Sequence, residues 1–132
     1  MPFTVGDVIA ERTVHLTRES LVRYAGASGD FNPIHYRDDV AAEVGLPGVL
    51  AHGMLTMGIA SSVVVAALEP TARIVDYGVR FTKPVVVDPE TGADVHVLAT
   101  VGAVEETAAR IDLKVTFGDA TVLVKAQLRV AI

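Results

Sequence analysis

The feature that most restricts the fold of this chain is a run from Pro47 to Leu68 that contains no Asp, Glu, Lys or Arg. Its length is sufficient to cross a bilayer. Polar residues and three glycines interrupt the run, however, and no belt of aromatic residues flanks it, which argues against a membrane span. We instead expect a helix that begins around His52 and Gly53, ends before Pro70, and is covered by other elements because it is apolar on all sides.

A change of period after this run predicts a sheet. Apolar residues recur at every second position from Val75 to Phe81, and Pro84 ends this predicted strand. The dipeptide Gly118-Asp119 is typical of a hairpin turn between two further strands. Including those two, three more strands are predicted, at residues 95–104, 110–117 and 121–130.

Upstream of the helix, residues 11–16 are expected to form a first strand, and Thr17 is expected to cap a short helix. A second small helix is expected to begin with Asp38 as its cap. The order of elements describes one α+β domain over residues 1–132. It predicts a single hot-dog fold, in which an antiparallel sheet of about five strands wraps around the long central helix.

Composition limits the partners that the chain can have. The formal net charge is −5, and no basic block or basic-aromatic patch is present, so we expect no nucleic acid partner. The chain contains no cysteine, which excludes disulfides, a thiol nucleophile and thiolate metal ligands. No secretory signal is visible, so a cytoplasmic location without a membrane partner is expected. The edge of the predicted sheet has unpaired backbone groups, which favours a dimer.

The candidate chemistry lies in the stretch Gly29-Asp30-Phe31-Asn32-Pro33-Ile34-His35. The Asn-Pro pair predicts a turn, because proline fixes its own φ and disfavours the helical conformation of the residue before it. This bend can direct the carboxylate of Asp30 and the imidazole of His35 into one pocket, and both groups can carry protons. The alternative is that Asp30 caps the turn and His35 is an ordinary loop histidine.

The residues from Tyr24 to His35, with Ala41 six positions beyond the histidine, resemble the hydratase signature of the MaoC-like (R)-specific enoyl-CoA hydratases. The segment Ala51-His52-Gly53-Met54 resembles the start of the long helix in that family. The likeness extends over nearly the whole chain. It is especially close to the catalytic subunits of mycobacterial (3R)-hydroxyacyl-ACP dehydratases.

The resemblance implies reversible hydration of a trans-2-enoyl thioester to a (3R)-3-hydroxyacyl thioester of CoA or acyl carrier protein in fatty-acid metabolism, without a cofactor. Water loses a proton as it attacks C3, C2 gains one, and charge collects on the thioester oxygen. The family implies that His35 activates the water, that Asp30 exchanges the C2 proton and that Asn32 supports both. The backbone amide of Gly53 is the candidate oxyanion donor, because it lies at a predicted helix N-terminus.

Other residues are candidates for binding. Ser61 matches a pocket-lining serine of related enzymes, although a serine on a packed helix needs no such role. Arg80 and Lys83 can meet the phosphates of CoA or of a phosphopantetheine arm, or can be solvated charges at a strand end. His52 can be catalytic, or it can pack against or cap the helix. No metal site is expected, because the histidines and acids lack compact ligand spacing.

Two other functions fit the same scaffold. A hot-dog thioesterase would direct water at the thioester carbonyl and would release a free thiol. A non-catalytic subunit would complete the acyl tunnel of a related chain, but the intact acid, amide and imidazole argue against that interpretation. We expect either a homodimer or a heterodimer with a related subunit.

Overall fold

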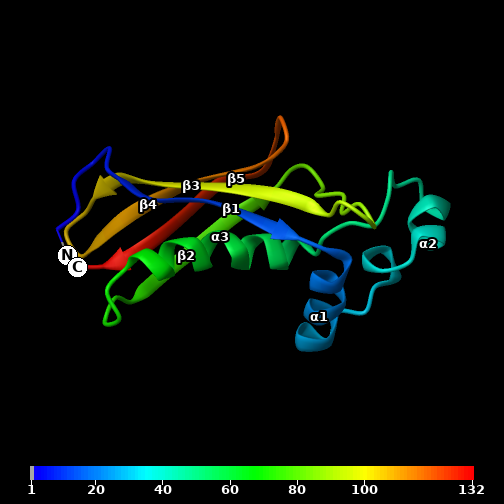
Figure 1. Ribbon diagram of the computed structural model, residues 1–132. Coiled ribbons are helices and arrows are strands. Elements are labelled where there is room, and N and C mark those ends of the chain that lie inside the picture. Colours follow the sequence, from blue (N-terminus) through cyan, green and yellow to red (C-terminus); the bar gives the residue numbers. More distant parts are fainter. Residues whose placement is uncertain (1) are drawn as a thin grey trace.

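The computed structural model describes residues 2–132, and its framework is a five-stranded antiparallel sheet. The strand order across the sheet is β1-β3-β4-β5-β2. The strands are β1 (Val8–Leu16), β2 (Ile74–Phe81), β3 (Ala93–Val104), β4 (Ala108–Phe117) and β5 (Ala120–Ala131). The long helix α3 (Gly53–Ala67) lies along one face of the curved sheet (Figure 1). This is the predicted hot-dog arrangement.

The core lies between α3 and the inner face of the sheet. Alternate side chains of the three central strands are buried there, as the period of two predicted. Burying one large aliphatic side chain contributes roughly 1.5–3 kcal/mol, so this interface is the main apolar contact of the fold. Its fully buried members include Ala60, Val64, Val95, Val97, Ile111, Val115 and Leu128.

The strands agree with the prediction in number and order, and the two-residue hairpin at Gly118-Asp119 is confirmed by the pairing of Phe117 with Ala120. The strands β1, β3, β4 and β5 begin slightly earlier than the apolar pattern indicated. Ladder hydrogen bonds join backbone groups, so the pairing extends beyond the alternating residues from which the strands were predicted.

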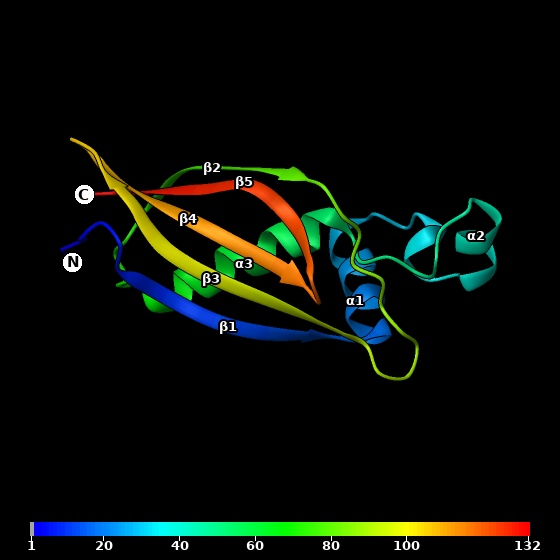
Figure 2. The same ribbon diagram turned by 90° about the horizontal axis from the view of Figure 1, so that it is seen from above.

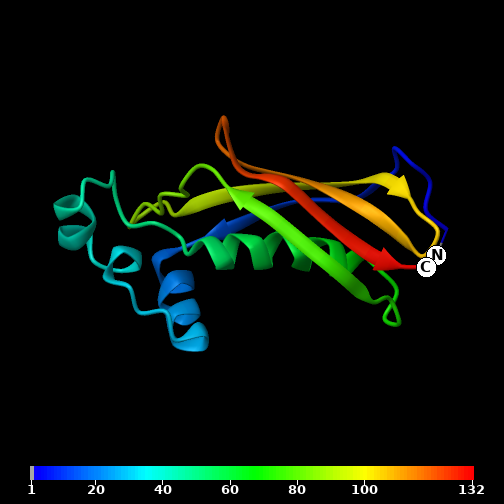
Figure 3. The ribbon, with the colours of Figure 1, turned by 180° about the vertical axis from the view of Figure 1, so that it is seen from behind.

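Three short helices lie beyond one end of the sheet, next to the N-terminus of α3 (Figure 3). They are α1 (Arg18–Ser28), the 3₁₀ helix η1 (Pro33–His35) and α2 (Asp38–Glu43). Thr17 caps α1 as predicted, through a reciprocal pair of hydrogen bonds with Ser20.

Asp38 does not cap α2, so that prediction is wrong. It is the first residue of the helix, and Arg37 is in the capping position without a side-chain bond. The carboxylate of Asp38 instead accepts two hydrogen bonds, of 2.8 and 3.1 Å, from the guanidinium of Arg18, which lower its pKa. Arg18 Nε also donates to the backbone oxygen of Val87 (2.6 Å). The guanidinium offers two parallel charge-assisted donors to the carboxylate, and the pair joins α1 to α2 and to the segment before β3.

The sheet covers only one side of α3. Its 15 residues make the helix about 22 Å long, close to the predicted length. Met54 and Val65, on the other side, are 59% and 53% exposed. The expectation that other elements cover the helix on all sides is therefore wrong for the single chain, because one curved sheet can enclose only part of a helix surface.

The edge strands of the sheet are β1 and β2 (Figure 2). Two register shifts interrupt the pairing of β2 with β5. Bulges of this kind turn the strand, so the apolar positions of β2 are not equally covered. Tyr77 and Val79 are half-buried, whereas Val75 and Phe81 are 55% and 54% exposed.

None of the helices within residues 2–132 is both long enough and apolar enough to cross a membrane.

Tyr77 joins the edge strand β2 to α3, which generates a test of this packing. Its hydroxyl donates to the backbone oxygen of Met57 (2.6 Å), and burial raises the pKa of the phenol to about 12. Tyr77→Phe keeps the ring but removes this donor, so we expect the free energy of unfolding to fall by about 1 kcal/mol. Urea denaturation measures the change. Tyr36→Phe, at a ring that is 42% exposed, is the control, and equal stability of the two variants would contradict the assignment.

Candidate active site

A cavity of about 290 Å³ opens at the N-terminus of α3. Its wall combines η1, the segment before α3, the end of β2 and the start of β5. Most of the lining is apolar, and polar groups enter it at few positions. A cavity of this kind suits an apolar ligand that is oriented by a few polar contacts. The residues that line the cavity include His35, Gly53, Thr56, Phe81, Lys83 and Leu123.

The imidazole of His35 is oriented by the backbone. Its Nδ1 lies 2.6 Å from the carbonyl oxygen of Leu50, and its side chain is only 11% exposed. A carbonyl can only accept, so we assign the proton of the neutral ring to Nδ1. Nε2 therefore carries a lone pair. It lies 4.0 Å from Oδ2 of Asp30, which is too long for a direct hydrogen bond but is a separation that one water with bonds of about 2.8 Å can bridge.

Asp30 is placed by the end of α1. Gly29 ends that helix with φ at +77°, a conformation that favours glycine, and its N–H donates to the oxygen of Ala25. The Asp30 carboxylate accepts a hydrogen bond from the N–H of Asn32 (3.1 Å), and its side chain is 53% exposed. The carboxylate is thus held on one oxygen while the other faces His35.

Asn32 supports the site through the turn. Its side-chain oxygen accepts from the N–H of Ile34 (3.2 Å), which caps η1, and its carbonyl accepts from the N–H of His35 (3.1 Å). These bonds fix the backbone that carries the imidazole of His35, so the predicted supporting role of Asn32 has a structural basis in the turn.

His52 lies behind His35 and is 1% exposed. The two rings are stacked, with centroids 3.8 Å apart and planes at 21°, and the ring of Tyr24 contacts His52 edge-on at 4.7 Å. Nε2 of His52 donates to the backbone oxygen of Asp30 (3.1 Å). Burial lowers the pKa of His52, and His35 adds to this effect. The side chain packs, as one interpretation of the sequence proposed, but it does not cap α3.

Gly53 is the first residue of α3 and lines the cavity. Within residues 2–132 no backbone oxygen accepts from the N–H of Gly53 or of Met54. A Cβ at position 53 would lie 3.0 Å from the ring of Phe81, so glycine leaves room beside these amides. Free donors at a helix N-terminus favour a negative charge.

The predicted binding residues are not all brought to the cavity. Lys83 lines it, whereas Arg80 is exposed on β2 and does not. The hydroxyl of Ser61 donates to the oxygen of Gly58 (2.9 Å) within α3 and is also outside the lining.

Sequence reasoning did not single out Phe81 and Leu50 for the site. The alternating pattern predicts Phe81 only as a strand residue, and its place beside the N-terminus of α3 depends on how β2 pairs. The carbonyl of Leu50 left no signal, because a backbone acceptor is not encoded by residue type.

The side chains of Asp30, His35 and His52 lie close enough together to suggest a metal site, with one candidate ligand atom of each within 4.8 Å of the others. The stacking argues against this, because the in-plane lone pairs of stacked rings run side by side rather than toward one ion. Nδ1 of His35 and Nε2 of His52 are also bonded to carbonyl oxygens. The arrangement suits proton transfer better than metal binding.

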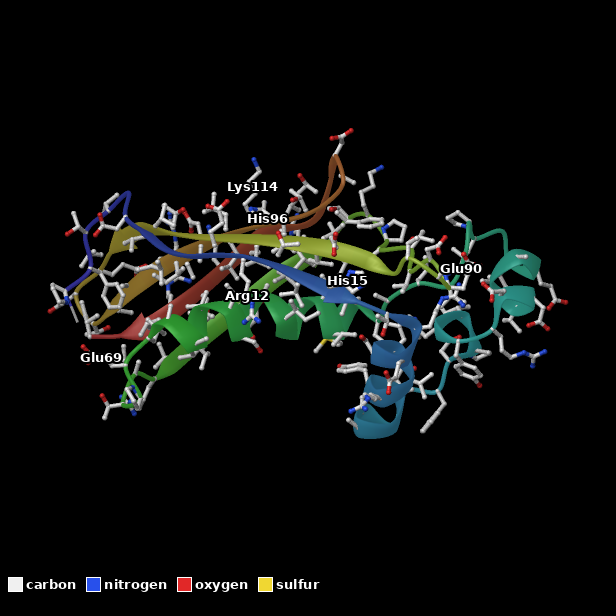
Figure 4. The ribbon with its side chains drawn as sticks, in the orientation of Figure 1. Arg12, His15, Glu69, Glu90, His96 and Lys114 are labelled. Atoms are coloured by element: carbon white, nitrogen blue, oxygen red, sulfur yellow. The ribbon has the colours of Figure 1, made fainter. Side chains whose placement is uncertain are left out.

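The other two histidines lie on β1 and β3. His15 pairs with Asp94 at 2.7 Å, and His96 bonds to Thr13 and Glu11, both at 3.0 Å. His96 stands on the side of the sheet away from α3 (Figure 4). Neither lines the cavity, so both stay unassigned.

Residues 4–121 match the family model described as MaoC like domain. The chain belongs to the MaoC-like dehydratase family. The resemblance of the hydratase signature is thereby confirmed. The (R)-specific enoyl-CoA hydratase of Rhodospirillum rubrum is 31% identical over 118 residues, which cover 85% of this MaoC-like chain and 82% of the relative.

Two further comparisons agree with this family. The 3-hydroxyacyl-thioester dehydratase X of Mycobacterium tuberculosis is 40% identical over 82 residues, which are 60% of this chain and 27% of the relative. A solved MaoC-like dehydratase has a TM-score of 0.89 and 30% identity, and the match covers 97% of this chain and 40% of that chain. The MaoC-like chain thus spans about a quarter of dehydratase X and less than half of the solved relative.

Proposed function

We propose that this MaoC-like chain, as one domain over residues 1–132, catalyses the reversible hydration of trans-2-enoyl thioesters to (3R)-3-hydroxyacyl thioesters in fatty-acid metabolism. The observation that carries the proposal is the free Nε2 of His35, which faces the Asp30 carboxylate at 4.0 Å beside a cavity. The hydratase and dehydratase names of the relatives support it. CoA and acyl carrier protein are both candidate carriers, and the cytoplasmic location stays a prediction.

In the dehydration direction, the Asp30 carboxylate takes the proton from C2, and protonated His35 gives a proton to the hydroxyl that leaves C3. Hydration reverses both steps, so Nε2 of His35 takes a proton from water and Asp30 gives one to C2. The bond from Nδ1–H to the Leu50 carbonyl stabilises the imidazolium that forms. The water position between the two side chains is where the hydroxyl enters and leaves.

Negative charge collects on the thioester oxygen during either direction. The unpaired N–H of Gly53 is the proposed donor to this oxygen, and the dipole of α3 adds to it. The acyl chain then lies along the apolar wall near Phe81 and Leu123. Lys83 is the proposed contact for a phosphate of the carrier, because it is a cationic residue that lines the cavity. Ser61 and Arg80 stay predictions without a contact to the cavity.

We also propose that a second copy of the chain covers β2 and the exposed side of α3. The edge strand has unpaired backbone groups, and exposed apolar side chains such as Met54, Val65, Val75 and Phe81 lie on these two elements. Phe81 also lines the cavity, so a partner at this surface would help to close it. A related subunit in place of the second copy is the alternative.

Removal of either proton carrier tests the chemistry. Asp30→Asn and His35→Gln preserve size, and we expect kcat for enoyl-CoA hydration to fall about 100-fold or more. His96→Gln on the outer face is the matched control and should retain full activity. Loss of enoyl absorbance measures the reaction, and circular dichroism checks folding.

Wild-type turnover in either folded variant would contradict the assignment. Crotonyl-CoA, longer enoyl-CoAs and enoyl-carrier substrates should be compared. Release of free thiol without hydration would instead identify a thioesterase.

The oxyanion donor can be tested by two substitutions at one position. Gly53→Pro removes the N–H where proline is tolerated, because it is the first residue of the helix. Gly53→Ala adds a similar Cβ beside Phe81 but keeps the N–H. We expect kcat of the proline variant to be about 100-fold below that of the alanine variant. Equal kcat values would remove Gly53 from the oxyanion site.

The dimer can be tested by mass. Light scattering should give twice the chain mass for the wild type and a monomer for Val75→Lys, because a lysine on an edge strand opposes pairing. Val5→Lys, at a valine that is 60% exposed but lies outside β2, should remain dimeric. A monomeric wild-type chain would contradict the homodimer and leave the related subunit as the partner.

A further inference from the structure

We propose that His52 is a positioning residue that holds the carboxylate of Asp30 and the imidazole of His35 in their working geometry, and that it does so as a neutral ring. This inference rests on the proposed function of those two groups. His35 and His52 together form the histidine stack.

The first part of the argument is the bond from His52 to the catalytic loop. Nε2 of His52 is 3.1 Å from the backbone oxygen of Asp30, the same residue whose carboxylate lies 4.0 Å from Nε2 of His35. The carbonyl only accepts, so we assign the His52 proton to Nε2. The side chain of Asp30 is half exposed, and beyond its own turn this bond is what ties the residue to the start of α3.

The second part is the contact with His35. The Leu50 carbonyl fixes the edge of the His35 ring through Nδ1, and the ring of His52 covers its face at 3.8 Å. Leu50 and His52 belong to the same short segment before α3. One segment thus sets both the tilt and the rotation of the catalytic imidazole, and it also sets the position of the Asp30 backbone.

The third part is charge. The groups that face His52 are the phenol of Tyr24 from α1, the backbone and carboxylate of Asp30 from the loop, and the imidazole of His35 from η1. Nδ1 of His52 is buried and has no hydrogen-bond partner within residues 2–132. His35 becomes cationic when it takes a proton from water. A second cation stacked against it would oppose that step, so a neutral His52 leaves the positive charge to His35.

Two substitutions separate the hydrogen bond from the ring. His52→Gln keeps an N–H at the reach of Nε2 but loses the ring, and His52→Phe keeps a stacked ring but loses the donor. We expect kcat of His52→Phe to fall about 100-fold, as for a small displacement of catalytic groups. We expect kcat of His52→Gln to stay close to the wild-type value. In both variants KM should change by much less than kcat does in His52→Phe.

His96→Gln is the control, because it removes an exposed imidazole from the outer face. A loss in kcat for His52→Gln that equals or exceeds the loss for His52→Phe would overturn the proposal. Unchanged kcat in both variants would also overturn it.

A measurement on the wild-type chain keeps the proposal testable if a variant does not fold. Nitrogen chemical shifts of the histidine rings report the tautomer and charge of each ring without any substrate. We expect His52 to carry its proton on Nε2 and to become charged only at a pH below the ordinary histidine pKa of about 6.5. We expect His35 to carry its proton on Nδ1. Protonation of His52 at or above pH 6.5, or a proton on its Nδ1, would overturn the inference. Absence of hydratase activity in the wild type would instead count against the proposed function.

Discussion

Two hydrogen bonds from histidine rings to backbone carbonyls organise this site. The Leu50 carbonyl determines which nitrogen of His35 is free, and the Asp30 carbonyl does the same for His52. Both bonds join the loop that carries Asp30 and His35 to the segment at the start of α3. The proposed chemistry therefore depends on the position of this loop against the helix N-terminus, and these two hydrogen bonds fix that position.

The sheet positions the helix, and the helix positions the loop. Apolar side chains of β3, β4 and β5 hold α3 along the inner face, so its N-terminus projects toward the short helices at one end of the molecule. The pair of Arg18 with Asp38 and its bond to Val87 attach those helices to the rest of the fold. The same arrangement leaves the far side of α3 and the β2 edge uncovered. Phe81 at this edge also lines the cavity, so a partner that covers the edge would complete the cavity wall.

Much of the fold was predictable because periodicity reflects burial. The uncharged run placed the start of α3 to within one residue, and alternation located the strands. The end of α1 and the turn at Asn32 follow from local rules for glycine and proline. The cap of α2 was mispredicted, because Asp38 had a distant competitor, Arg18, that no local rule reveals. Exposure along β2 was also unpredictable from pattern alone, because it depends on bulges that arise only when the strand pairs.

The sequence by itself determined which residue types are available for proton transfer and the bend that carries them, because these depend on side-chain chemistry and local backbone preference. Only the tertiary structure decided that His52 stacks on His35, that Leu50 orients the ring, and that Ser61 and Arg80 lie away from the cavity. These relations join segments far apart along the chain. They are set by the path of the backbone through space, and this path cannot be inferred from the residue type at any single position.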